Sequence, residues 1–391
     1  MFDFDRVINR KNTNCAKFDA AAANGLPEDV LPLWVADMDF AAPECVLEAL
    51  HKAIDHGIFG YSILGDEYFA AIRNWFYQRF SWAVERSWLV TTPGVVFALS
   101  CAVRAATQPG DAVLVQPPVY YPFFRVIQEN DRKVIESPLV YEQGKYSVDF
   151  GDLEEKIRKN NVKLFILCSP HNPVCRVWTR EELQRLGSIC QRYGVTVISD
   201  EIHCDFAFPE YPHTPFPVAC PELAENTIVC TAPSKSFNLA GLQVSNIFIP
   251  GEKLRASFQK QMEIICYHEP NRLGAIACTA AYQNGGPWLD ACKAYMRDNL
   301  NYLRAFLQEH APAIRLVEPE GTYLAWLDCS GLGMTKDELD DLIVNKAKLW
   351  LDTGSIFGST AEQFQRVVLA CPRKTLEEAL HRLAEALSDP T

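Results

Sequence analysis

Lys235 is the residue of this 391-residue chain whose surroundings most favour chemistry. It lies in Thr231-Ala-Pro-Ser-Lys-Ser-Phe237, directly after the apolar run 227–231, which we interpret as a buried strand. Ligands of α/β proteins gather at the carboxyl ends of strands. A lysine amine that is removed from water there has a lowered pKa and can act as a nucleophile. A lysine whose aliphatic stem packs on a loop fits the same string, so the motif alone leaves both interpretations open.

Two polar residues follow the neighbouring candidate strands. Asp200 comes after the apolar run 195–199, and Asn172 lies between two prolines after the run 163–168. A carboxylate in such a place can keep a pyridinium nitrogen protonated, which makes pyridoxal 5′-phosphate (PLP) a strong electron sink. An amide in a rigid turn can hydrogen-bond a ring oxygen. The structural alternatives are a helix cap for Asp200 and an Asx turn for Asn172, and Lys235 after the next strand favours the chemical interpretation.

Three further motifs could bind an anion, a ring or a carboxylate. Thr92-Pro-Gly-Val-Val96 precedes a helical pattern and would present free backbone N–H groups to a phosphate, to which Ser234 could add a hydroxyl. Tyr121 follows the run 112–116 and could stack on a planar ring. Arg373, in Ala370-Cys-Pro-Arg373, could bind a carboxylate with its two-pronged guanidinium. An ordinary helix start, a tyrosine packed in a proline-rich loop and a surface ion pair are the structural alternatives.

The elements that would position these residues are typical of an α/β domain followed by a smaller α+β lobe. Between about 45 and 282, short apolar runs alternate with helical patterns, which predicts a mainly parallel sheet covered on both faces. Thr179-Arg-Glu-Glu182 is a capping box at the start of a helix expected over 179–193. The predicted strands are 112–116, 163–168, 195–199, 227–231 and 244–249. The smaller lobe is predicted to hold helices at 288–310, 336–346 and 375–387 and strands at 313–317, 322–327 and 364–370.

Composition excludes several classes of partner. With 37 basic and 49 acidic residues the net charge is −12, which argues against nucleic acid or an anionic membrane. No apolar run reaches the roughly 20 residues of a membrane span, and the acidic N-terminus is unlike a signal peptide, so we expect a cytoplasmic protein. The fourteen cysteines include no CxxC pair, and we expect free thiols, with no metal site and no disulfide framework.

Taken in order, the motifs resemble fold-type I PLP enzymes of the class I/II aminotransferase superfamily, and more narrowly the MalY/PatB-like cystathionine β-lyase branch. The resemblance implies an aspartate aminotransferase-like fold, in which a seven-stranded, mainly parallel sheet lies between helices. It divides the chain into an N-terminal segment, 1–45, a PLP-binding domain, 46–285, and a small α+β domain, 286–391. The strings that carry the narrow match span nearly the whole chain: Pro32-Leu-Trp-Val-Ala-Asp-Met-Asp-Phe40, Gly60-Tyr-Ser62, Gln116-Pro-Pro-Val-Tyr-Tyr-Pro-Phe123, Ser169-Pro-His-Asn-Pro-Val174, Ser199-Asp-Glu-Ile-His203, Ser234-Lys-Ser-Phe-Asn-Leu-Ala-Gly-Leu242 and Ala370-Cys-Pro-Arg373.

The resemblance also implies a role for each candidate residue. Lys235 would carry PLP as a Schiff base, and Asp200 would pair with the pyridinium nitrogen. The other roles are ring stacking by Tyr121, contacts with the phenolic oxygen by Asn172 and His203, phosphate binding by Val95, Val96 and Ser234, and binding of the substrate α-carboxylate by Arg373, with Asn172 beside it. Tyr61 would reach the phosphate from the neighbouring subunit, which implies a homodimer with shared active sites.

The implied reaction is α,β-elimination on L-cystathionine or a related L-cysteine S-conjugate, giving a thiol, pyruvate and ammonia. An aminotransferase on the same scaffold, or a regulatory protein that binds PLP, are the alternatives. Three positions depart from the family pattern. Gln243 replaces an arginine that many aminotransferases use for phosphate, which suits the lyase branch. Cys175-Arg176 replaces Gly-Arg, and Val368 replaces an expected Asn, which leaves loop geometry and substrate fit open.

Overall fold

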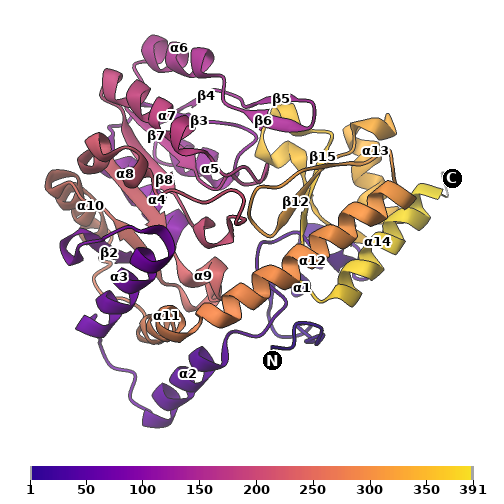
Figure 1. The fold of residues 1–391 in the computed structure, drawn as a ribbon, viewed down its shortest axis with the longest axis horizontal. Helices are drawn as coiled ribbons and strands as arrows, with labels where there is room; N and C mark the ends of the chain where they lie inside the picture. Colours follow the sequence, from indigo (N-terminus) through magenta and orange to yellow (C-terminus); the bar gives the residue numbers. More distant parts are fainter. Residues whose placement is uncertain (1, 389–391) are drawn as a thin grey trace.

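The computed structural model describes residues 2–388 and has an open α/β sheet with helices on both faces (Figure 1). The sheet has seven strands, as predicted, and their order is β2-β10-β9-β8-β7-β3-β4. Only β10 runs antiparallel to its neighbours, β2 and β9. The strands are β2 (Leu89–Thr92), β3 (Ala112–Val115), β4 (Lys133–Glu136), β7 (Leu164–Cys168), β8 (Thr196–Asp200), β9 (Thr227–Thr231) and β10 (Ser245–Phe248).

The central strands are apolar throughout because their alternate side chains enter two different cores. In β7, Leu164 and Ile166 belong to the core formed with α4, α5 and α10, whereas Phe165 and Leu167 belong to the core formed with α6 and α7. A strand covered on both faces has no polar side. The helices are α4 (Val95–Ala106), α5 (Pro122–Gln128), α6 (Phe150–Asn160), α7 (Arg180–Tyr193) and α10 (Glu252–Ile264).

The five strands predicted for this domain are confirmed as β3 and β7 to β10, each within two residues at either end. The capping box is confirmed too, because the Thr179 hydroxyl accepts from the amide of Glu182 and the Glu182 carboxylate accepts from the amide of Thr179. Strands β2 and β4 were not predicted from the sequence. Both are four-residue strands at the edges of the sheet, and the ends of β4 are exposed and charged.

The smaller lobe holds a four-stranded antiparallel sheet in the order β11-β12-β15-β14, packed against long helices. Strand β1 (Leu31–Pro32) pairs with β13 (Leu349–Trp350), which brings the N-terminal segment to this lobe. The limits of the three predicted segments stay a prediction. The elements are β11 (Arg315–Val317), β12 (Leu324–Asp328), β14 (Asp352–Thr353), β15 (Phe364–Val368), α12 (Gly286–His310), α13 (Lys336–Asp341) and α14 (Arg373–Ser388).

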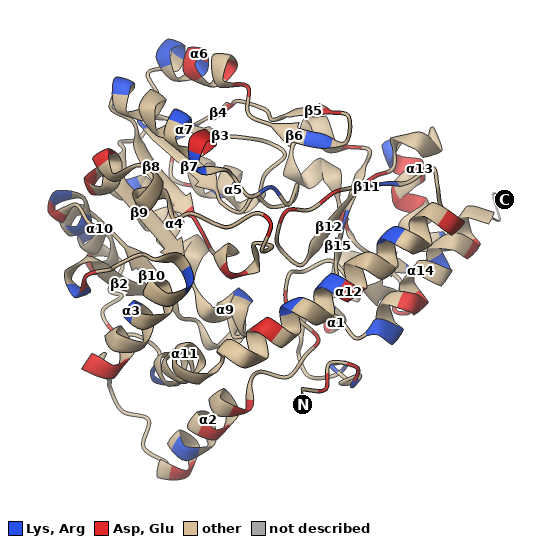
Figure 2. Cartoon of the chain, viewed as in Figure 1, with Lys and Arg blue, Asp and Glu red and all other residues tan. Residues whose placement is uncertain are grey.

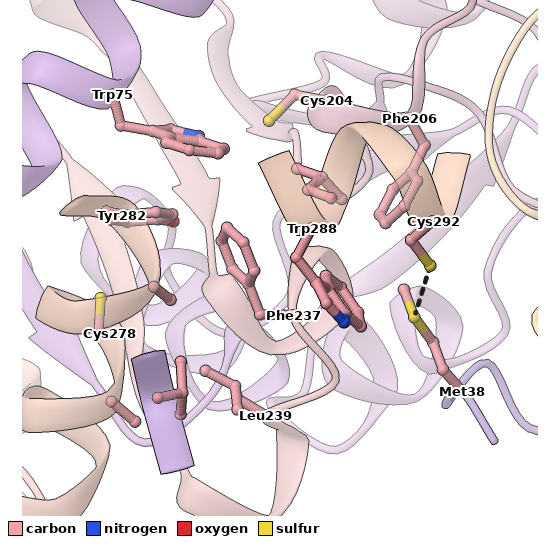
Figure 3. Packing of buried hydrophobic residues seen from close by; sticks show 14 of the residues in the cluster. Met38, Trp75, Cys204, Phe206, Phe237, Leu239, Cys278, Tyr282, Trp288 and Cys292 are labelled. Atoms are coloured by element: carbon pink, nitrogen blue, oxygen red, sulfur yellow. Dashed lines mark hydrogen bonds between the residues drawn. The ribbon is translucent and has the colours of Figure 1, made fainter. Parts of the chain in front are cut away.

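An aromatic core surrounds Phe237, which lies two residues beyond Lys235 (Figure 3). Phe237 packs against Trp75, Tyr282 and Trp288, with ring centroids 5.4, 6.0 and 6.3 Å away. These rings come from α3 (Asp66–Phe80), α11 (Arg272–Asn284) and α12. Because Phe237 is only two residues beyond Lys235, this core fixes the backbone from which the amine projects.

Charged side chains of both signs are spread over the helices (Figure 2). Among residues 2–388, no helix combines the length and the apolar character needed to cross a membrane.

Candidate active site

One cavity of about 200 Å³ collects most of the predicted residues. It lies at the carboxyl ends of β3, β7, β8 and β9. Pro93 and Gly94, which directly follow the edge strand β2, also line it. Parallel strands end at the same edge, so residues far apart in sequence meet there. The cavity is lined by Lys235, Asp200, Asn172, Tyr121, His203, Ser234, Val95 and Val96, together with Trp34, Val35, Ala36, Asp352 and Arg366.

Lys235 projects into the cavity from the short helix α9 (Pro233–Ser236). Its Nζ donates a hydrogen bond to the backbone carbonyl of Ala36 at 2.6 Å. Burial, assisted by the positive charge of Arg366, lowers the pKa of the amine to about 8, although Asp37 and Asp200 oppose the shift. About a tenth of the amine is therefore neutral at pH 7, far more than for an exposed lysine, and this neutral form is the one that acts as a nucleophile or a general base.

Asp200 ends β8 and is 3% exposed. Its carboxylate accepts a hydrogen bond from the amide of Ile202 at 3.2 Å. Burial raises the pKa of Asp200 to about 7, and Glu201 adds to the shift, whereas the Ile202 amide and Lys235 lower it. A cationic ring N–H placed against this carboxylate would favour its ionised form.

His203 and Asn172 also line the cavity, and both are buried. Burial lowers the pKa of His203 to about 3, which keeps the ring neutral. Within residues 2–388, its Nδ1 is buried and has no hydrogen-bond partner. The side-chain oxygen of Asn172 accepts from Nη1 of Arg366 at 2.9 Å. The neutral imidazole of His203 and the amide of Asn172 are therefore two uncharged polar groups in the lining of the cavity.

The N-terminus of α4 forms the polar end of the cavity. Gly94 precedes the helix, and a Cβ at this position would meet no other atom within 4 Å. The first amides of a helix, here those of Val95 and Val96, have no partner inside the helix and attract anions. Ser234 lines the same cavity. This end therefore suits a phosphate group.

Together these groups match the functional groups of PLP. The amine of Lys235 suits the aldehyde, the carboxylate of Asp200 suits the ring nitrogen, and the neutral imidazole of His203 lines the same cavity. Tyr121, 37% exposed at the start of α5, offers an aromatic ring at the mouth. The helix N-terminus is available to the phosphate.

Arg373 does not reach the cavity, and this corrects the sequence prediction. Its Nε donates to the side chain of Asn299 at 2.8 Å, and its guanidinium lies over the ring of Tyr302 at 4.7 Å. The arginine that lines the cavity is Arg366, in the middle of β15 and 3% exposed. The sequence held a signal for it, since Arg366 is the one charged residue of the buried strand 364–368.

Trp34, Val35 and Ala36 also line the cavity, although none of them was predicted as a site residue. They belong to the string 32–40 that carried part of the resemblance. An ionic cluster fixes this segment. Lys17 is fully buried and donates to Asp39 at 2.9 Å, and Arg10 donates to Asp39 at 2.7 Å. The cluster positions the Ala36 carbonyl, which also accepts from the hydroxyl of Tyr323 at 3.0 Å.

Tyr61 lies outside this cavity and is 96% exposed. It lines a separate hollow with Gln243 and Arg272. Its contact with a cofactor across a subunit interface stays a prediction.

Comparisons with known proteins agree with this geometry. The model for the family "Aminotransferase class I and II" matches residues 28–383. Cystathionine beta-lyase PatB of Bacillus subtilis is 42% identical over 99% of this chain and 100% of its own, and protein MalY of Escherichia coli is 35% identical over 99% of both chains. Cystalysin from Treponema denticola, whose crystal structure contains PLP, superimposes with a TM-score of 0.96 and 38% identity over 100% of both chains. The chain belongs to the class I and II aminotransferase family and, within it, to the branch that holds PatB and MalY.

Proposed function

We propose that this protein is a PLP-dependent carbon–sulfur β-lyase that cleaves L-cystathionine or related L-cysteine S-conjugates. The observation that carries the proposal is the meeting of three groups in one buried cavity, namely the neutralisable amine of Lys235, the carboxylate of Asp200 and the guanidinium of Arg366. The relationship to named cystathionine β-lyases supports the choice of reaction.

Eight residues would hold the cofactor. Lys235 would bind it covalently, Asp200 would hold the proton on the ring nitrogen, and Asn172 and His203 would contact the ring oxygen. Tyr121 would stack on the ring, and the amides of Val95 and Val96 with the Ser234 hydroxyl would bind the phosphate. When bound, PLP accepts the electron pair left on the substrate Cα after its proton departs.

The chain's own residues then manage the proton and the orientation of the substrate. Nζ of Lys235, with its pKa lowered to about 8, takes the Cα proton. Arg366 binds the α-carboxylate and is itself fixed by Asn172 and by the carbonyl of Trp34. The Cβ–S bond then breaks and the sulfur leaves as a thiol. With one water consumed, L-cystathionine yields homocysteine, pyruvate and ammonia.

An aminotransferase is the second candidate, because the family model that matches the chain carries that name. Purified protein supplied with PLP and L-cystathionine, and with no keto acid, distinguishes the two reactions. A lyase releases pyruvate and a thiol in equal amounts. Turnover only after a keto acid is added would identify an aminotransferase, and no turnover in either condition would favour a protein that binds PLP without catalysis.

The homodimer and the cytoplasmic location belong to the same proposal. Four large apolar side chains of one segment are well exposed, at 62% for Ile58, 62% for Phe59, 96% for Tyr61 and 93% for Ile63. Such a patch is typical of an interface and supports a second copy there, with Tyr61 reaching its partner's cofactor. The many buried free thiols suit a reducing compartment.

A further inference from the structure

Arg366 has few hydrogen-bond donors left for a substrate. Its Nη1 donates to Asn172, and its Nη2 donates both to the carbonyl of Trp34 at 2.8 Å and to the carboxylate of Asp352. Nη2 carries two hydrogens, so both are in use. Its Nε is buried and has no partner within the described residues.

A guanidinium can form two parallel hydrogen bonds with a carboxylate along either of two edges, and both edges include Nη2. One edge pairs Nη2 with Nη1, and the other pairs Nη2 with Nε. A substrate carboxylate that binds bidentately must therefore displace Trp34 or Asp352 from Nη2 of Arg366. If it displaces Trp34, two carboxylates share one buried guanidinium, and like charges close together in a buried site repel strongly.

The fold places Asp352 in this position by strand register. Strand β14 pairs antiparallel with β15, and Asp352 lies directly opposite Arg366. Asp352 is 6% exposed and lines the cavity. Arg366 is the one side-chain partner of its carboxylate among residues 2–388. The pair is therefore a fixed feature of the small sheet that faces the substrate.

We propose that Asp352 is a built-in competitor for Arg366, which weakens the binding of every substrate carboxylate and so sets substrate affinity. The inference rests on the proposed function, because it takes Arg366 as the site of the α-carboxylate. The net free energy of substrate binding is then the free energy of the Arg366–substrate contact minus that of the Arg366–Asp352 contact that it replaces. A neutral residue at position 352 would therefore increase the affinity for the substrate.

Asp352→Asn tests this inference because it keeps the shape of the side chain and removes its charge. Two quantities should fall by about one to two decades, the worth of one charge-assisted hydrogen bond. They are the KM for L-cystathionine and the dissociation constant of propionate, the latter measured by calorimetry on the PLP-saturated protein. Asp328→Asn is the matched control. Asp328 is also 6% exposed and lies in the same sheet, but it bonds Ser330 and Tyr141 and does not line the cavity.

The outcomes separate this inference from the proposed function. A higher or unchanged KM and propionate dissociation constant in Asp352→Asn would overturn it, because Asp352 would then only orient Arg366. If Asp352→Asn does not fold, Asp352→Ser replaces it, with the same expected direction. A wild-type protein without lyase activity would contradict the proposed function, while propionate binding would still decide whether Asp352 competes for Arg366.

Discussion

Lys235 and Asp200 have pKa values that burial has drawn towards each other, to about 8 for the amine and about 7 for the carboxyl. Model peptides separate the same groups by more than six units, with lysine near 10.4 and aspartate near 3.9. A site that titrates near neutral pH in this way is suited to moving protons.

The lowered pKa of Lys235 makes cofactor capture depend on pH. Only the neutral amine attacks an aldehyde, so the rate at which the apoprotein captures PLP should rise about tenfold per pH unit below pH 8 and level off above it. Stopped-flow absorbance measures this rate. Asp200→Asn removes a charge that raises the Lys235 pKa, so its midpoint should lie at lower pH. A midpoint near pH 10 in the wild type would show that the amine is not desolvated.

Lysine substitutions at Arg366 and Arg373 test which arginine binds the substrate α-carboxylate. Arg366→Lys should lower kcat/KM for L-cystathionine by one to two decades, since the loss of a charge-assisted hydrogen bond costs about 1.5–3 kcal/mol. Arg373→Lys should change kcat/KM much less, because Arg373 contacts Asn299 and Tyr302. If steady-state kinetics rank the two variants in the opposite order, Arg373 and not Arg366 binds the substrate α-carboxylate.

The sequence could not separate these two arginines by pattern alone. Both lie in one short stretch, and every residue of β15 is buried, so no alternation marks the face that meets the cavity. Lys235, Asp200 and Asn172 were predictable because each lies at or shortly after the carboxyl end of a strand that is itself visible as an apolar run. Asp352 was not, because its strand is two residues long and carries no apolar run.

At the scale of elements, the α/β core could be predicted because its strands are continuous apolar runs and its helices carry start signals. The edge strands β2 and β4 escaped prediction because an edge strand is short and only partly buried. The short helix α9, which carries Lys235, depends on tertiary contacts. Phe237 packs against rings from three helices that are distant in sequence, and no local sequence pattern predicts these contacts.

The Thr179 capping box offers a test of local helix energetics away from the cavity. Thr179→Ala should lower the free energy of unfolding by about 1 kcal/mol, because the Glu182 amide loses its acceptor. Urea unfolding of the PLP-saturated protein measures the change, and Thr179→Ser, which keeps the hydroxyl, is the control. Equal stability of the alanine and serine variants would show that the hydroxyl contributes nothing.

At the scale of the whole molecule, active sites shared through the exposed Tyr61 would allow two inactive variants to complement each other in a mixed dimer. Lys235→Ala and Tyr61→Ala proteins should each be strongly impaired alone. Mixed dimers of the two contain one site with both native residues, so subunit exchange should restore activity to about a quarter of the wild type. Pyruvate release after mixing measures the recovery. No recovery in dimers shown to be mixed would mean that Tyr61 does not act across the interface.

The most direct test of the central claim, that one cavity built around Lys235 carries a lyase, is borohydride reduction of the PLP-loaded protein. Reduction fixes the cofactor to the amine that holds it, and peptide mass mapping then identifies that amine. The account predicts one label per chain, on the peptide that contains Lys235, and loss of pyruvate release from L-cystathionine in proportion to labelling. A label on another lysine, or full pyruvate release after complete labelling of Lys235, would contradict it.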